Sequence, residues 1–191
     1  MILFLLLLVI KTEAKSNLPN ESVNVQGDNK SSVKQKELYN LYELAKKAEA
    51  KNLPIVLTFV AEWCEFCHIL GSEVLDPMAL SGVYDENYMF MRYVSIDDPK
   101  PIKGFDNKLM IKDKFADKYN ADLTPTMIFI DSTGKQVADP IVGIAAIELY
   151  SMLIHKALNQ AYKNMNKPLK IPSTVEELFK VHPLLMDTLK E

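Results

Sequence analysis

The sequence has 191 residues, of which 48% are hydrophobic and 25% charged, and its formal net charge is −3. A chain of this length and composition can bury a substantial core, which predicts a single folded domain. The small negative charge and the absence of a basic run argue against a nucleic-acid-binding protein. The two cysteines, Cys64 and Cys67, fall in one short motif, so the sequence excludes a framework of structural disulfides.

The sequence begins with a continuous apolar run, Ile2–Ile10, that changes character abruptly at Lys11. This run is too short to cross a bilayer, which needs about twenty residues, but it suits the apolar region of a signal peptide. Thr12 and Ala14 are small enough to precede a cleavage site. We therefore expect a signal peptide over residues 1–14 and an exported, periplasmic protein. No positive residue precedes the run, which an upstream start or a truncated N-terminus would explain. A buried strand or a short membrane-touching anchor stays open as an alternative.

Residues 15–32 are predicted to form a flexible linker, because Asn, Ser, Gln, Gly and Lys are common there and no apolar periodicity is present. A helix is expected to begin at Ser32, where Gln35 would complete a capping box. Its apolar stripe ends near Asn52, and Pro54 prevents the helix from continuing.

Apolar periodicity predicts alternating strands and helices in the rest of the domain, which we place at residues 33–164. A strand is expected at 55–60, followed by a helix that Pro77 kinks or breaks. The further elements are a strand at 88–96, a helix at 107–118 capped by Asn120, a hairpin of strands at 126–131 and 135–142, and a last helix with apolar residues from Ile147 to Ala161. This order predicts an α/β fold in which helices flank a mixed sheet.

Residues 165–191 are expected to form a short helical C-terminal extension. The rigid stretch Lys167–Pro172 precedes Thr174, which caps a helix through Val181. The apolar side chains of the extension need a surface to pack on, either the back of the domain or a partner protein. These side chains belong to Leu178, Phe179, Leu184, Leu185 and Met186.

The motif Cys64-Glu-Phe-Cys67 directly follows the apolar strand that begins after Pro54. Two cysteines at this spacing form a dithiol that can close into a disulfide. If Cys67 lies in the first turn of the next helix, then Cys64 lies at its N-terminus, where unpaired N–H groups and the helix dipole stabilise a thiolate. The pattern therefore predicts a thiol–disulfide oxidoreductase whose redox group is the Cys64–Cys67 disulfide, with no other cofactor.

Four segments give the chain a resemblance to the thioredoxin family, from Leu38 to Lys163. Ala61–Cys67 resembles its W-C-x-x-C active site, and Thr124–Thr126 resembles its cis-proline loop. Asp131–Gly134 is similar to the hairpin turn that follows, and Val142–Gly143 to the glycine before the last helix. The resemblance implies a thioredoxin fold, in which helices flank a mixed central sheet.

The subgroup that the chain resembles is the exported thioredoxin-like reductases, of the SoxW type or like the C-terminal domain of DsbD, which share the long segment Glu73–Pro77. This resemblance implies a protein that reduces disulfides of exported proteins. Because the exported compartment is oxidising, such a dithiol is expected to need a membrane thiol reductase as its electron donor. We also expect a monomer. Trp63 stands beside a nucleophilic cysteine, so it is expected to offer a flat surface to partners, with a core position as the alternative. Thr124 and Pro125 would hold an extended substrate through its backbone.

The thiols have different expected roles. Cys64, as the more exposed one, would attack a substrate disulfide, and Cys67 would then resolve the mixed disulfide. Carboxylates at Glu62 and Glu65 disfavour the Cys64 thiolate, and this makes a dithiol more reducing. His68 would offset them when protonated. The balance of charges favours a reductase.

Two positions depart from the thioredoxin pattern. Thr58 stands where thioredoxins carry a buried acid, and Tyr93 stands where they carry a lysine. Deprotonation of Cys67 is therefore expected to depend on water, on Glu62 or on the partner protein. This difference favours a narrower role than general thioredoxin activity.

Other readings stay open beside the reductase. A disulfide donor or isomerase would use the same fold, a c-type haem protein would use Cys64–His68 as its attachment signature, and a redox-inactive adaptor would only bind peptides. Haem leaves the loop at Thr124–Thr126 unexplained, and an adaptor needs neither cysteine. No metal site is expected, because His155 falls off the apolar stripe of its helix and His182 lies in the tail.

Overall fold

The computed structural model describes residues 35–181. The expected signal peptide at 1–14 and linker at 15–32 lie outside the described residues, as do Leu184, Leu185 and Met186. Among the residues that are described, no helix combines the length and the apolar character needed to cross a membrane.

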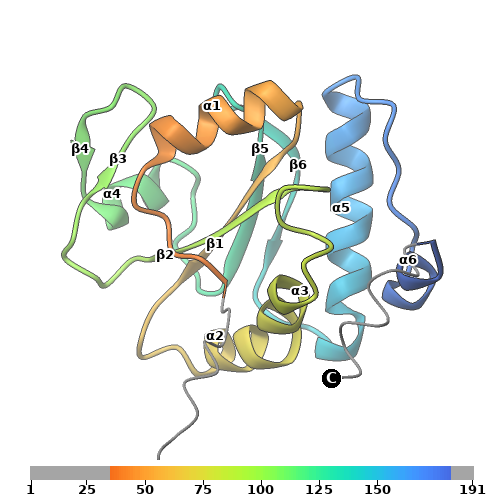
Figure 1. Cartoon of the computed structure of the whole chain (residues 1–191). Coiled ribbons are helices and arrows are strands. Elements are labelled where there is room, and N and C mark those ends of the chain that lie inside the picture. Colours follow the sequence, from red (N-terminus) through yellow and green to blue (C-terminus); the bar gives the residue numbers. More distant parts are fainter. Residues whose placement is uncertain (1–34, 182–191) are drawn as a thin grey trace, which may run out of the picture. The chain divides into compact units, whose positions relative to one another are not determined.

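A four-stranded sheet with the strand order β2-β1-β5-β6 forms the centre of the described region (Figure 1). β1 runs parallel to β2 and antiparallel to β5, and β5 forms an antiparallel hairpin with β6. Two short strands, β3 and β4, form a separate antiparallel pair. The strands span Ile55–Val60 (β1), Phe90–Ser95 (β2), Ile102–Lys103 (β3), Leu109–Met110 (β4), Thr126–Ile130 (β5) and Gln136–Val142 (β6). The predicted mixed sheet is confirmed.

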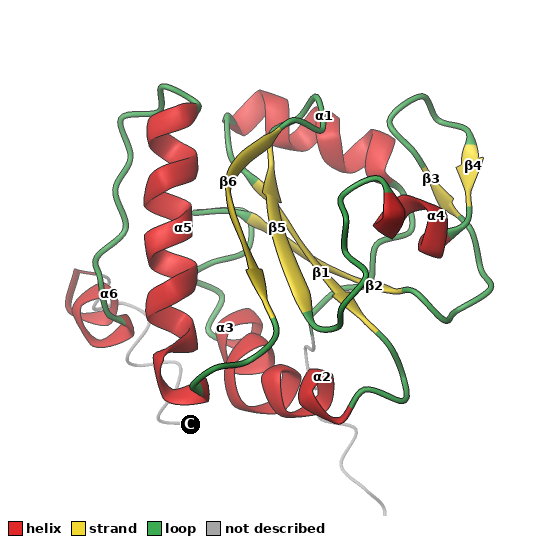
Figure 2. Ribbon diagram, turned by 180° about the vertical axis from the view of Figure 1, so that it is seen from behind, coloured by secondary structure: helices red, strands yellow, loops and turns green. Residues whose placement is uncertain are grey.

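Helices cover both faces of this sheet (Figure 2). After the cysteine motif the chain stays helical through α2, a π-helical turn (η1) and α3. Pro77 lies in the first turn of α3. The kink or break expected at Pro77 therefore takes the form of the π turn that precedes it. The helices span Leu41–Lys51 (α1), Glu65–Leu70 (α2), Gly71–Leu75 (η1), Asp76–Leu80 (α3), Lys112–Asp117 (α4), Ile147–Leu149 (η2, a 3-10 turn), Tyr150–Asn164 (α5) and Val175–Val181 (α6).

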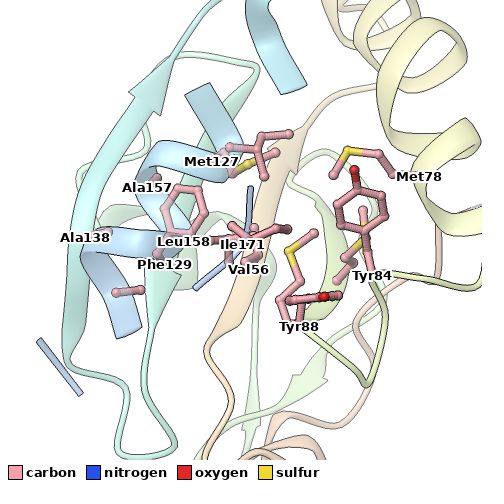
Figure 3. Close-up of a cluster of buried hydrophobic side chains, with 14 of the residues drawn as sticks. Val56, Met78, Tyr84, Tyr88, Met127, Phe129, Ala138, Ala157, Leu158 and Ile171 are labelled. Carbon is pink, nitrogen blue, oxygen red and sulfur yellow. The ribbon is translucent and has the colours of Figure 1, made fainter. Parts of the chain in front are cut away.

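The core has two parts because the side chains of β1 alternate between the faces of the sheet. Ile55, Leu57 and Phe59 pack with buried residues of α1 and α4. Val56 points the other way, into a cluster that also receives side chains of β5, β6, α3, α5 and α6. Figure 3 shows part of this second cluster, in which Val56 lies near Leu158 of α5.

The first helix starts later than its sequence pattern indicates. Asn40 is the N-cap, and its side-chain oxygen accepts the backbone N–H of Glu43 at 3.1 Å. Residues 35–40 are not helical, so the predicted helix start is wrong for these residues, whereas Ser32 itself lies outside the described residues. The predicted end is confirmed, because Asn52 adopts a left-handed conformation with φ of 48°.

The segment that was expected to be helical instead follows the outer edge of β2. The backbone N–H of Leu38 donates to the carbonyl of Tyr93 at 2.8 Å, and Tyr93 N–H donates to the carbonyl of Lys36 at 3.0 Å. The N–H of Gln35 donates to the carboxylate of Asp76 at 3.1 Å. These long-range bonds outweigh a local capping preference.

The outer edge of β6 is covered by side chains of α5. Asn164 donates its amide to the carbonyl of Val137 at 2.8 Å, and the N–H of Asp139 donates to the side-chain oxygen of Gln160 at 3.2 Å. The next residue, Pro140, has no N–H to offer.

The helix predicted at 107–118 is shorter than expected, because it covers only Lys112–Asp117. The residues before it form the β3–β4 hairpin. The turn of this hairpin contains Asn107 in a left-handed conformation with φ of 61°. The N–H of Gly104 donates to the carbonyl of Lys108 across the turn at 2.8 Å. The left-handed cap predicted at Asn120 is confirmed, with φ of 52°.

The described part of the C-terminal extension packs on the domain. Ile171 and Leu178 are fully buried in the same cluster as α5. Thr174 caps α6, since its hydroxyl accepts the N–H of Glu177 at 3.2 Å. His155 is also fully buried, so the prediction that it lies off the apolar face of α5 is wrong. The C-terminal extension covers the side of α5 that carries His155, and the carbonyl of Pro172 in the extension lies within hydrogen-bond distance of the His155 ring.

Candidate active site

The cysteine motif lies at the end of β1, where a tight turn leads into α2. The carbonyl of Ala61 accepts the N–H of Cys64 at 3.1 Å, which closes the turn around Glu62 and Trp63. Cys64 is the N-cap of α2, and Cys67 lies in its first turn. The placement expected from the motif is therefore the one that the fold produces.

The two cysteines are joined by a disulfide with an S–S distance of 2.21 Å. The backbone N–H of Cys67 donates to Cys64 Sγ at 3.2 Å. A donor in this position favours the charged form of a sulfur that becomes a thiolate when the disulfide opens. The site is therefore oxidised in this structure, and the N–H of Cys67 is placed to stabilise a Cys64 thiolate once the disulfide is reduced.

The exposure of the two cysteines differs from expectation. Cys64 is 5% exposed and Cys67 is 7% exposed, so Cys64 is not the more accessible residue in the oxidised form. Both pack against Ala61, with Val60 and Ile96 beside them. A division of labour between the thiols must therefore rest on their places in α2, where Cys64 caps the helix and Cys67 lies within it.

The side chains next to the disulfide project into solvent. Trp63 is 74% exposed and Phe66 is 61% exposed, although both are large and apolar. The acidic residues Glu62 and Glu65 are also exposed. The surface around the motif therefore combines aromatic and acidic groups.

Thr124 and Pro125 lie beside the end of β1, as the register of the sheet shows. Phe59 of β1 pairs with Thr126 of β5, so the residues before Thr126 flank the start of the motif. The Thr124–Pro125 bond is cis, and the carbonyl of Pro125 accepts the N–H of Gly143 at 2.8 Å. Leu123, just before them, is 66% exposed.

His68 and an acid that the sequence analysis did not single out hold the backbone of Glu62. His68 Nε2 lies 2.7 Å from the carbonyl oxygen of Glu62. The N–H of Glu62 donates to Asp97 Oδ2, also at 2.7 Å. Asp97 comes thirty-three residues after Cys64 in the sequence, and only the pairing of β1 with β2 brings it here.

Thr58 and Tyr93 are neighbours, paired across β1 and β2. Thr58 is fully buried, and its hydroxyl accepts the amide of Gln35 at 3.5 Å. Burial raises the pKa of Tyr93, and the nearby Glu37 carboxylate raises it further. Neither side chain of the pair is an acid or a base suited to neutral pH.

A cavity of about 350 Å³ opens beside Cys67. Its wall includes the side chains of Glu62, His68 and Asp76, together with the Tyr93 phenol. Sequence reasoning considered Glu62 as an aid to Cys67 but did not find Asp76. Asp76 is nine residues beyond Cys67, with a π turn between them. Because a π turn changes the number of residues per turn, the spacing of 3.6 residues per turn does not predict that both residues lie on one face of the helical stretch.

No cluster of three or more His, Cys, Asp and Glu side chains with the geometry of a metal site occurs within residues 35–181. Of the histidines considered as ligands, His68 contacts the Glu62 carbonyl, and His155 bonds Tyr84 and Pro172 in the core. His182 lies outside the described residues.

Comparison with known proteins gives one family. A family model described as a thioredoxin-like domain matches residues 41–158. No curated protein sequence matches the chain significantly.

Among solved structures, the DsbH oxidoreductase is similar at a TM-score of 0.50 and 18% identity, over 71% of this chain and 92% of that one. Thioredoxin of Fasciola hepatica is 24% identical at a TM-score of 0.44, over 64% of this chain and 99% of that one. The thioredoxin pre-protein of Schistosoma mansoni is 28% identical at a TM-score of 0.41, over 65% of this chain and 98% of that one. At this identity, the likeness to DsbH is one of fold.

Proposed function

This chain belongs to the thioredoxin-like family, and we propose that it is a reductase that uses Cys64 and Cys67 to reduce disulfides of exported proteins. The observation that carries the proposal is the Cys64–Cys67 disulfide at the N-terminus of α2, with the N–H of Cys67 directed at Cys64 Sγ. A disulfide in this place can open to a dithiol without unfolding the domain, because the helix and the sheet hold both residues.

The reaction is a two-step exchange that starts from the dithiol. The Cys64 thiolate attacks one sulfur of a substrate disulfide, which forms a mixed disulfide and releases the other substrate sulfur as a thiolate. Cys67, once deprotonated, attacks Cys64 Sγ, closes the disulfide and releases the second substrate sulfur. Two electrons pass to the substrate, and its two thiolates take up protons.

The exposed surface around the motif fits a protein substrate. Trp63, Phe66 and Leu123 are large, apolar and more than half exposed, so they offer apolar surface on which a partner could pack. Backbone groups of Thr124 and Pro125, beside the end of β1, would pair with an extended substrate segment. An unfolded or loop disulfide could thus be held next to Cys64.

The acidic groups at Glu62 and Glu65 support the reducing direction. Each adds negative charge close to Cys64, which opposes its thiolate and so favours the disulfide form of this protein over the dithiol. A dithiol of this kind gives up electrons readily. In the exported location that residues 1–14 suggest, it would need a membrane thiol reductase to regenerate it, because that compartment is oxidising.

Trapping of mixed disulfides tests the roles of the cysteines. Cys67→Ser should accumulate mixed disulfides through Cys64, whereas Cys64→Ser should accumulate almost none, and a variant with both changes serves as the blank. Equal trapping by the two single variants would refute the assigned roles.

The redox potential tests the direction. We expect a value near that of thioredoxin, about −270 mV, when the protein is equilibrated with a glutathione or thioredoxin couple. In its native compartment the protein should be mainly reduced and should become oxidised when the electron supply is removed. A potential above about −150 mV, with mainly oxidised protein in cells, would instead assign it as a disulfide donor.

A further inference from the structure

The backbone of Glu62 is held from two sides by groups that belong to different elements. On one side its N–H donates to Asp97 Oδ2 at 2.7 Å, and on the other its carbonyl lies 2.7 Å from His68 Nε2. We call this arrangement, made of the Glu62 backbone, the His68 ring and the Asp97 carboxylate, the Glu62 bracket. It encloses the turn that presents Trp63 and leads into Cys64.

The contact with His68 has a defined polarity. A carbonyl oxygen can only accept, so Nε2 must carry the hydrogen and donate it. Nε2 is protonated in one neutral tautomer and also in the imidazolium, so the bond persists when the ring gains a proton. The backbone of His68 is fixed as well, because its N–H donates to the carbonyl of Cys64 at 3.3 Å. The ring therefore links the first turn of α2 back to the preceding turn.

The contact with Asp97 links the same turn to the sheet. The other oxygen of Asp97 accepts the hydroxyl of Ser95, at the end of β2, at 3.0 Å. Next to it, the N–H of Ile96 donates to the carbonyl of Val60, at the end of β1, at 2.9 Å. Asp97 is thus fixed to the paired ends of β1 and β2, and the bracket holds the Glu62 backbone between these strand ends and α2.

The bracket matters most when the disulfide is open. In the oxidised form the S–S bond ties Cys64 to Cys67 covalently. After reduction that restraint is lost, and the turn before Cys64 is held by its own Ala61–Cys64 hydrogen bond and by the bracket. The reduced form is also the one that attacks a substrate.

We propose that His68, together with Asp97, is a positioning residue that fixes Trp63 beside Cys64 in the reduced protein and so prepares the surface on which a protein substrate docks. This role rests on the proposed function and differs from the tuning by charge that the sequence suggests for His68. It acts through hydrogen bonds to the Glu62 backbone and does not depend on the charge of the ring.

The test compares variants that remove the donor or acceptor with variants that keep it. His68→Leu and Asp97→Ala remove one side of the bracket each. His68→Gln keeps an N–H at a similar reach, and Asp97→Asn keeps an oxygen for Glu62 N–H and an amide for Ser95. Ser72→Ala is the control on the same helical stretch, because it removes only a local hydrogen bond to Ile69.

Two kinds of substrate separate docking from thiol chemistry. For reduction of insulin, His68→Leu and Asp97→Ala should lower kcat/KM about tenfold, mainly through a higher KM, because the loss of a hydrogen bond is comparable to this factor. For a small aromatic disulfide, which needs no docking surface, the change should be under about threefold. His68→Gln, Asp97→Asn and Ser72→Ala should stay near the wild type.

A direct readout of the turn is available because Trp63 is the only tryptophan in the sequence. Its fluorescence anisotropy should decay faster in reduced His68→Leu and Asp97→Ala than in the reduced wild type, with a smaller difference between the oxidised forms. Conservative variants should restore the slow decay. If the anisotropy of the reduced protein does not respond to His68→Leu or Asp97→Ala, or if His68→Gln behaves like His68→Leu, the bracket has no positioning role.

The two proposals fail in different ways. If the wild type reduces neither insulin nor the small disulfide, the proposed function is wrong, while the anisotropy of Trp63 still decides whether the bracket orders the turn. If the wild type is active and the donor-removing variants are equally active on insulin, the proposed function stands and the positioning role is refuted.

Discussion

His155 Nδ1 lies 2.7 Å from the carbonyl oxygen of Pro172, so the ring of a core helix donates a hydrogen bond to the C-terminal extension. With its hydrogen on Nδ1, the neutral ring accepts the hydroxyl of Tyr84 at Nε2, 2.9 Å away. Burial lowers the pKa of His155, and the bond to the Pro172 carbonyl only partly opposes this. The extension is therefore joined to the domain through a histidine that the fold keeps neutral.

This histidine should make the stability of the protein depend on pH. Because its pKa is lower in the folded state than the usual value near 6.5, the unfolded state binds the proton first as the pH falls. The free energy of unfolding should therefore decrease below about pH 6.5, with a slope of at most about 1.4 kcal/mol per pH unit from this group.

Urea unfolding at several pH values between 7.5 and 5 measures this dependence. His155→Asn keeps a donor for Pro172 and does not titrate, so its curve should be flatter than that of the wild type. Carboxylates titrate in both proteins and cancel in the comparison. Parallel curves would show that His155 is not responsible.

The hydroxyl of Tyr84 should stabilise the core through this same ring. Tyr84→Phe leaves Nε2 of a buried histidine without its donor, and we expect a loss of about 1–2 kcal/mol in the free energy of unfolding. Tyr150→Phe is the matched control, because the Tyr150 hydroxyl is buried and has no hydrogen-bond partner among the described residues. The control should be neutral or stabilising. If both substitutions cost the same, the hydrogen bond to His155 contributes nothing.

Two glycines should respond to alanine in opposite ways. Gly71 has helical angles, φ of −58° and ψ of −59°, and nothing lies within 4 Å of an added Cβ. Gly71→Ala should therefore raise the free energy of unfolding by about 0.5–1 kcal/mol. Gly134 has φ of +85°, and its Cβ would lie 2.5 Å from the Phe105 ring. Gly134→Ala should lower stability by about 1–3 kcal/mol. Chemical denaturation of both variants measures the change in the free energy of unfolding, which should be positive for Gly71→Ala and negative for Gly134→Ala.

The charge of Glu65 should lower the potential of the dithiol. Glu65 is the first residue of α2, directly after Cys64. Glu65→His replaces a carboxylate at a helix N-terminus by a neutral or cationic ring, which favours the thiolate and should raise the potential by about 10–30 mV. Glu73→His, two helical turns further on, should have a much smaller effect in the same equilibration. An unchanged or lower potential in Glu65→His would contradict the electrostatic account of the reducing direction.

Local patterns in the sequence were sufficient where local forces decide the structure. The motif at Cys64 and Cys67 predicts a helix N-terminus after a strand, and Asn52 predicts the end of α1, because a left-handed cap needs only its own backbone. The start of α1 was not predictable in this way. Ser32 and Gln35 have the spacing of a capping box, but the segment from Gln35 pairs with β2, which the local sequence does not reveal.

The errors in the site have a similar origin. His155 was expected off the apolar stripe of α5, because periodicity within the helix cannot anticipate that Pro172 returns to cover it. Asp97 was not recognised because only the pairing of β1 with β2 brings it to the site. Asp76 was not recognised because a π turn separates it from Cys67. The burial of both Cys64 and Cys67 depends on how Val60 and Ile96 pack beside them, which follows only from the assembled fold.

The coverage of the sheet edges has a consequence for contacts between copies of the chain. An unprotected outer strand is a template on which another molecule can add a strand, and this is a common start of aggregation. Here the edge of β2 already pairs with Lys36 and Leu38, and the edge of β6 is occupied by side chains of α5 and interrupted by Pro140. Strand addition from a second copy is therefore opposed at both outer edges of the four-stranded sheet.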